Sequence, residues 1–173
     1  MYTTSNEYKN KILEHSRQFE TKITIGNRII TNEEVTSLSV QQQIQQDATF
    51  SVGNAIASVL NLNFLHNDID TNDRDSINVQ LGLLVNGEYE YRPIGIYNIE
   101  TLNSNDTITT IVAYDNMVKF DKLYSENLER PTVHSVINRL VEITGVKFDG
   151  NLYDYNNYSL IALKGYSCRE ILG

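Results

Sequence analysis

The acidic stretch DIDTNDRD carries oxygen-bearing side chains at alternate positions, as the start of a calcium-binding loop does. Asp68, Asp70 and Asn72 fall on the first three ligand positions of such a loop. The loop also needs a glycine at its sixth position for a sharp turn, and a glutamate at its twelfth to bind the ion with both oxygens. Those two positions hold Asp73 and Val79. We therefore predict a solvated acidic loop between two strands, with no bound metal and no cofactor.

The other groups that could do chemistry are scattered along the chain. His15, His66 and His134 are far apart, and none has a second ligand at the spacing of a metal site. The single cysteine, Cys168, excludes an internal disulfide and any site built from several cysteines, and we predict that it is a small buried apolar residue. No local nucleophile motif is present. The sequence therefore predicts no catalytic residue and no enzymatic activity.

Tyrosine is the most abundant aromatic residue, with 11 Tyr, 5 Phe and no Trp. Tyr89, Tyr91 and Tyr97 fall on predicted strands, where amphipathic rings suit a half-buried sheet or a subunit interface. A sugar-stacking surface is the alternative for the same residues. A free-standing β-rich module that binds a glycan through tyrosines, or calcium through the acidic loop, therefore stays open as a second function.

Charge and hydropathy exclude two classes of partner. The 22 acidic residues outnumber the 14 basic ones, which are dispersed, so the formal net charge is -8. A phosphate backbone repels such a surface, and we expect no nucleic-acid binding. The longest apolar stretch, residues 52–65, is interrupted by Asn54, Asn61 and Asn63 and is too short to span a bilayer. The N-terminus shows no signal peptide, so we expect synthesis in the cytoplasm without export by that route.

Strand periodicity runs from Lys22 to about Tyr114. In VLNLNFL, Leu60, Leu62 and Phe64 alternate with asparagines, which places one face of a strand in a core and the other in water. Several short strands joined by compact turns indicate an antiparallel sandwich or a small barrel, not a parallel sheet.

Turn and breaker residues separate these strands. Gly26-Asn27 and Asn86-Gly87 each lie between two strand-like arms and are typical of tight hairpin turns. Pro93 cannot donate a ladder hydrogen bond, so we expect its strand to break or to lie at an edge there.

A helix is predicted in RPTVHSVINRLVEITGV. Pro131 lies near its start and Gly145 at its end, and they bound an apolar stripe at helical spacing formed by Val133, Val136, Ile137, Leu140 and Ile143. Further on, Ser167 and Glu170 have the spacing of a capping box for a second helix, whose start is present and whose body is missing.

The predicted fold class is α+β and mainly β, in three ranges. Residues 1–20 are a helical segment, in which Thr4 and Glu7 have the spacing of a capping box. Residues 21–122 are an antiparallel barrel-like or sandwich-like domain. Residues 123–173 are the start of a small α/β lobe that the end of the chain truncates.

Five segments resemble, in this order, the N-terminal half of tail and baseplate hub proteins. The segments are FSVGNAIASVLNLNFL, LLVNGEYEYRPIGIYNIE, TITTIVAYDNMVKFDKLY, RPTVHSVINRLVEITGVKF and GYSCREILG. Such proteins occur in phages and prophages of Gram-positive bacteria and are called tail-associated lysin or minor tail proteins. The resemblance covers residues 20–173 and implies barrel-like β-domains with an α/β insertion, assembled as a ring of three at the tip of the tail tube.

The resemblance implies a structural role in the virion tail. A subunit of this kind adapts the tail tube to the tip complex and gates its channel. The implied partners are two further copies of the chain and the neighbouring tail tube and distal tail proteins. In longer members of the family, enzymatic or receptor-binding work belongs to domains that follow this region, so the resemblance adds no catalytic residue.

Asp115 interrupts the apolar run of TIVAYDNMVKF. A carboxylate at this place could serve catalysis, or it could end a strand and cap the next turn. In the proteins that the chain resembles, the tyrosine-aspartate step ends a barrel strand and starts a short turn or helix. We therefore expect Asp115 to turn the chain.

Overall fold

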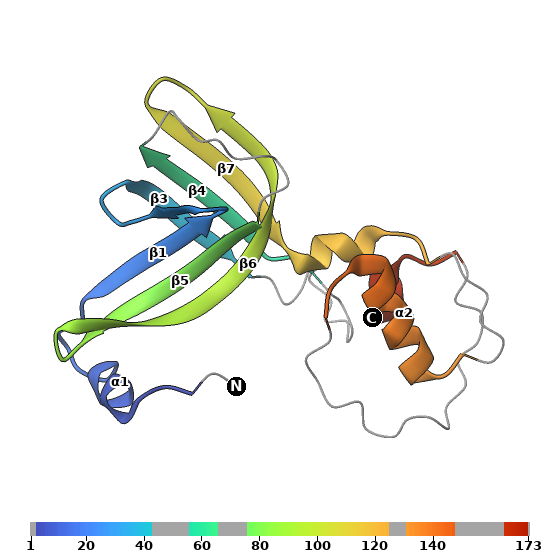
Figure 1. Cartoon of the computed structure of the whole chain (residues 1–173), viewed down its shortest axis with the longest axis horizontal. Coiled ribbons are helices and arrows are strands. Elements are labelled where there is room, and N and C mark those ends of the chain that lie inside the picture. Colours follow the sequence, from blue (N-terminus) through green and yellow to red (C-terminus); the bar gives the residue numbers. More distant parts are fainter. Residues whose placement is uncertain (1–2, 43–55, 66–75, 125–130, 148–164, 173) are drawn as a thin grey trace, which may run out of the picture. The chain divides into compact units, whose positions relative to one another are not determined.

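The structure, a computed structural model, describes residues 3–42, 56–65, 76–124, 131–147 and 165–172. The chain divides into two compact units. The first unit comprises Met1–Gln41 and Val59–Asp115, and the second comprises Gln42–Ser58 and Asn116–Gly173. The first is a sheet with one short helix, and the described part of the second is helical (Figure 1). The fold is thus mainly β with few helices, as the sequence predicts.

The sheet of the first unit has seven strands in the order β2-β1-β5-β6-β7-β4-β3, and every ladder is antiparallel. The strands are β1 (Phe19–Ile25), β2 (Arg28–Ile30), β3 (Val35–Gln41), β4 (Val59–Leu65), β5 (Ser76–Val85), β6 (Glu88–Ser104) and β7 (Ile108–Asp115). The long β6 pairs with β5 along its first part and with β7 along its last part. It thereby joins the two halves of the sheet.

One face of the sheet carries the core. Leu60, Leu62 and Phe64 of β4 are fully buried, which confirms the alternation predicted from VLNLNFL. The neighbouring strands contribute in the same way, through Ile23, Ile25, Ile77, Val79, Tyr97, Ile99, Ile111 and Ala113. Because each fully buried apolar side chain of this size contributes about 1.5–3 kcal/mol, this one-sided core is the main source of stability in the first unit.

The sheet is open, so the predicted barrel or sandwich is wrong: a single sheet takes its place. Among the described residues, β2 pairs only with β1 and β3 only with β4. Curvature of the sheet nevertheless brings its two ends near each other, since the Arg28 guanidinium of β2 lies 5.9 Å from the ring centre of Phe64 on β4. The core is therefore enclosed by the bending of one sheet (Figure 1). Alternation indicates which face is buried, but closure needs matched strands, and β2 has three residues.

Both predicted hairpin turns are present. Gly26, with φ 55°, helps to connect β1 to β2, and Asn86 (φ 51°) with Gly87 (φ 92°) connects β5 to β6. In the second turn both central residues, Asn86 and Gly87, have positive φ, which is the type I′ geometry that suits the twist of the flanking strands. Pro93 lies in the part of β6 that pairs on one side only, next to a bulge at Ile94. This confirms its predicted position at an edge.

The N-terminal helix α1 spans Asn6–Lys11 and packs against β5. The predicted capping box of Thr4 and Glu7 is wrong by one residue, because Ser5 is the N-cap and its hydroxyl accepts the Tyr8 N–H at 2.9 Å. Ser5 is favoured over Thr4 as the N-cap because its hydroxyl also donates a hydrogen bond to the Glu90 carboxylate of β6.

The described part of the second unit contains three helices, η1 (Asn116–Asp121), α2 (Val133–Thr144) and α3 (Cys168–Leu172), and one β-bridge, Leu123–Ser167. None of the described helices is long and apolar enough to cross a membrane. A small core joins them, formed by Phe120, Tyr124, Val136, Leu140 and Cys168.

The ends of α2 lie where the sequence predicts. The Thr132 hydroxyl accepts the Ser135 N–H at 3.2 Å, and Gly145 ends the helix with φ 71°. Glycine adopts this left-handed conformation without the steric cost that a side chain would add. Of the predicted apolar stripe, Val136 and Leu140 are buried and the other three residues are half-buried, while Thr144, which the prediction did not include, is buried as well.

Candidate assembly surfaces

The residues with predicted chemical potential do not converge. His15 and His134 are exposed, and Val79 is buried within β5. His66 and the acidic stretch 68–75 lie outside the described residues. Within the part of the chain that the structure describes, no group of three or more His, Cys, Asp or Glu side chains could hold a metal ion.

Asp115 lies at the end of a strand, as predicted. It is the last residue of β7, and η1 begins at the next residue. Across the ladder it pairs with Tyr97, a buried residue of β6. Burial raises the pKa of the Tyr97 hydroxyl, and the charge of Asp115 raises it further. Asp115 is thus placed where the chain leaves the sheet.

Cys168 is free and fully buried in the small core of the second unit. Burial raises the pKa of its thiol, although its own backbone and the charge of Lys122 act in the opposite direction. The thiolate is the reactive form of cysteine. Cys168 therefore acts as a small apolar residue, as the sequence predicts.

The predicted tyrosines lie on β6 but not on one surface. Tyr97 is buried, while Tyr91 lies on the outward face above Gly82, where an added Cβ would come within 2.9 Å of the Tyr91 ring. Tyr91 donates a 2.8 Å hydrogen bond to Glu20, and this bond is the largest cause that raises its pKa. The Tyr89 and Tyr91 ring centres are 6.2 Å apart. The hydrogen bond to Glu20 and the contact between the two rings hold Tyr89 and Tyr91 against the outward surface of the sheet.

A carboxylate holds α1 to the hairpin end of β5 and β6. Glu90 accepts hydrogen bonds from the Ser5 N–H at 3.1 Å and the Ser5 hydroxyl at 2.5 Å, and it forms an ion pair with Arg92. The Arg92 guanidinium in turn lies 5.3 Å from the ring centre of Tyr8 on α1. The two bonds from Ser5, its hydroxyl first, lower the pKa of Glu90. Glu90 thus serves as a structural contact of the helix.

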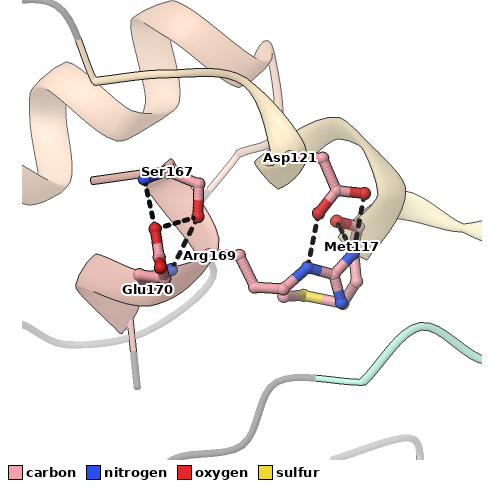
Figure 2. Close-up of polar contacts among 5 residues, drawn as sticks. All are labelled: Met117, Asp121, Ser167, Arg169 and Glu170. Atoms are coloured by element: carbon pink, nitrogen blue, oxygen red, sulfur yellow. Dashed lines mark hydrogen bonds and ion pairs between the residues drawn. The ribbon is translucent and has the colours of Figure 1, made fainter. Parts of the chain in front are cut away.

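A polar clasp joins α3 to η1 in the second unit (Figure 2). Arg169 donates from Nε and Nη2 to the two carboxylate oxygens of Asp121, at 2.6 and 3.1 Å, and from Nη2 to the Met117 carbonyl at 2.9 Å. The predicted capping box is confirmed beside it, because Glu170 accepts the Ser167 N–H at 2.7 Å and its hydroxyl at 2.8 Å. These bonds, the N–H first, lower the pKa of Glu170. We call the contacts of Arg169 the α3 clasp.

Several stretches of strand edge have no ladder partner among the described residues. They include the outer edges of β2 and β3, the edge of β1 before Ile23, one edge of β6 from Glu88 to Ile96 and its opposite edge from Ile99 to Ser104. Alternate backbone N–H and C=O groups point away from a sheet along such an edge. The shortness of β2, and Pro93 with its bulge in β6, are devices that limit unwanted pairing. The edge of β3 is regular from Ser37 to Gln41 and has neither device.

The outward side of four neighbouring strands carries a patch of uncharged side chains. Three rows run across β3, β4, β7 and β6: Ser37, Asn63, Thr110 and Asn103; Ser39, Asn61, Val112 and Thr101; Gln41, Val59, Tyr114 and Asn98. We call these residues the uncharged face. β3 and β4 contain no charged residue, and the nearest charges along β6 and β7 are Glu100, at a bulge, and Asp115. The outward side of β1, by contrast, carries Glu20 and Lys22.

Sequence reasoning did not identify the two polar clusters or the uncharged face. Ser5 and Glu90 are 85 residues apart, and Arg169 and Asp121 are 48 apart, so no local pattern joins them. The absence of charge from SLSVQ and VLNLNFL was a usable signal, but only the ladders show that these segments are neighbours.

Comparison with known proteins gives a distant likeness in structure. No family model matches the chain, and no curated protein matches it. Among solved structures, the chain is similar to a 43 kDa tail protein of prophage MuSo2 from Shewanella oneidensis, at 10% identity and a TM-score of 0.45. The match covers 88% of this chain and 47% of that protein, so the chain spans about half of the other's length.

Proposed function

We propose that the chain is a structural subunit of a phage or prophage tail tip or baseplate hub, which adapts the tail tube to the tip complex and performs no catalysis. The observation that carries the proposal is the open antiparallel sheet with its unpaired edges, above all the regular edge of β3. Free edges are a liability for a solitary protein, but in an assembly a neighbour can pair with them or cover them. The five ordered segments that resemble hub proteins support the same function.

A ring of three copies makes use of such edges. In a ring each copy contacts the next head to tail, so one surface of a copy meets a different surface of its neighbour. The β3 edge supplies backbone donors and acceptors for one side of that contact. The other expected partners are the neighbouring tail tube and distal tail proteins. The net charge of -8 also suits a channel wall, because it repels DNA instead of retaining it.

Three carboxylates of the described sheet and helices have structural tasks, which supports a role without catalysis for these groups. Glu90 holds α1, and Asp121 holds α3 through Arg169. Glu20 accepts the hydrogen bond of Tyr91. An acid–base catalyst needs a group that faces substrate, and these carboxylates face other parts of the chain.

Purified tail particles test this function. Quantitative mass spectrometry of particles induced from the source strain is expected to find three copies of the chain per tail, and antibody-gold labelling is expected to place them at the tip. Absence of the chain from intact particles would contradict the proposal. A melting temperature of the isolated chain that rises with calcium or with a glycan would instead favour the free-standing binding module.

A further inference from the structure

We infer that the uncharged face is an interface, and that the surface which covers it is the same face of a second copy of this chain. The face lies on the outward side of the sheet, opposite the core, across β3, β4, β7 and the last part of β6. The only described helix of the first unit, α1, packs instead against β5. No described element of the first unit therefore covers the face.

The composition of the face is that of an interface centre. Protein interfaces are distinguished by depletion of charge at their centre and by enrichment in aromatic residues, with a polar rim. Val59 and Tyr114 are direct ladder partners, and Val112 pairs with Asn61 beside them. These apolar and aromatic groups are half-buried and are surrounded by amides and hydroxyls. Of the nearest acidic groups, Asp115 pairs with the buried Tyr97 and so belongs to the other side of the sheet, and the exposed Glu100 lies at the bulge between Ile99 and Thr101 on β6, the last strand of the face.

Hydrogen-bonding character favours a second copy over a different partner. Amide and hydroxyl side chains both donate and accept, so a face built from them can pair with itself. A two-fold contact between identical patches requires such self-complementarity. An ionised side chain, by contrast, would meet its own like charge across the two-fold axis.

Net charge also restricts where two copies can meet. Each copy carries -8, and like charges buried together without partners are costly. The uncharged face is a surface on which two acidic copies can approach without burying a carboxylate. Added salt should therefore strengthen the contact by screening the remaining long-range repulsion.

The size of the face sets the expected strength. The three rows span five residues of β3 and of β4, which is roughly 17 Å, and four strands side by side are roughly 19 Å wide. Their product is about 300 Å², less than half of the roughly 800 Å² that each partner buries in a standard stable interface. The pairing is therefore weak, and it forms when other contacts or high concentration bring copies together.

This pairing goes beyond the proposed hub function and can fail separately from it. A ring of three is a head-to-tail contact, whereas the uncharged face makes a contact between identical surfaces. A chain that occurs in tail particles but never dimerises would keep the hub function and remove the pairing. A chain that dimerises through the uncharged face but is absent from tail particles would keep the pairing and remove the hub function.

Sedimentation equilibrium of the full chain tests the pairing, from about 1 µM to about 1 mM. Asn61→Asp places a carboxylate in the uncharged face, and we expect it to raise the dimer dissociation constant at least tenfold. Asn78→Asp is the matched control: it makes the same change at a half-buried outward position of β5, beside Thr24 and Ile96, and should alter the constant less than twofold. Circular dichroism and thermal melts check that both variants fold, and Asn61→Ser gives a neutral variant at the same position that should still dimerise.

Three results would overturn the inference. The first is a chain that remains monomeric to about 1 mM in both low and high salt. The second is a dimer that Asn61→Asp leaves intact, or that Asn78→Asp weakens to the same degree. The third is a neutral glycan or another protein that binds the native chain and loses its binding in Asn61→Asp, which would assign the face to that partner.

Discussion

The two units are stabilised in different ways, although each has its own buried core. In the sheet unit, apolar side chains from every strand form one cluster, and ladders join each strand to a neighbour. In the second unit the described core is small, and single polar contacts such as the α3 clasp fix its helices to one another. The comparison teaches that the sheet is held by many contacts shared among its strands, whereas the described helices of the second unit depend on a small core and a few named bonds.

Replacing a core phenylalanine by alanine, once in each unit, has the largest expected effect on the free energy of unfolding. Phe64→Ala in the sheet should lower the free energy of unfolding by about 4 kcal/mol, because the ring is fully buried among residues of several strands. Phe120→Ala in the second unit should cost about 3 kcal/mol and should loosen only that unit. Urea denaturation measures the loss of stability in each variant, and hydrogen exchange of individual amides in the folded protein shows which unit is loosened. Loss of protection in β4 and β7 in Phe120→Ala would show that the units are not independent.

The α3 clasp should give a smaller effect. Arg169→Met removes the two bonds to Asp121 and the bond to the Met117 carbonyl, and we expect a loss of about 1 kcal/mol. The value is modest because the Asp121 side chain is 60% exposed and water screens the ion pair. Arg169→Lys should not recover it, because an ammonium cannot bind both oxygens as the planar guanidinium does. Thermal melts of the three proteins measure the difference, and full recovery by lysine would contradict the bidentate geometry.

Acid should release α1 with the smallest effect on stability. The folded-state pKa of Glu90 is lowered from the ordinary value of 4.5, so its contribution is present above that value and is lost as the pH falls through the lower folded pKa. Glu90→Gln should loosen α1 at neutral pH and leave the sheet unchanged. NMR signals of Tyr8 and Leu62 report the helix and the sheet separately. Simultaneous loss of both signals on acidification would show that Glu90 is not the specific contact of α1.

The sequence predicts local features of the sheet well. Alternation in VLNLNFL gives the buried face of β4, and Asn86-Gly87 gives the hairpin between β5 and β6, because both signals depend on the geometry of adjacent residues. The strand end at Asp115 and both ends of α2 are local in the same sense. Closure of the sheet is not local, so the barrel-like prediction was wrong.

The candidate assembly surfaces illustrate the same limit. No spacing rule brings Ser37 of β3 beside Asn63 of β4 and Thr110 of β7, since strand order comes from tertiary pairing. Ser5 as the cap of α1 depends on Glu90, which is remote in the chain. Candidate surfaces of this kind can be recognised only after the ladders are known.

Amide hydrogen exchange, measured in the free chain and in purified tail particles, tests most directly the claim that the open sheet exists to make contacts. In the free chain we expect slow exchange in the central strands β5, β7 and β4 and fast exchange along the outer edge of β3 from Ser37 to Gln41. In particles, that edge should become protected by at least a hundredfold. An edge that is already protected in the isolated monomer, or that still exchanges freely in the particle, would contradict the account.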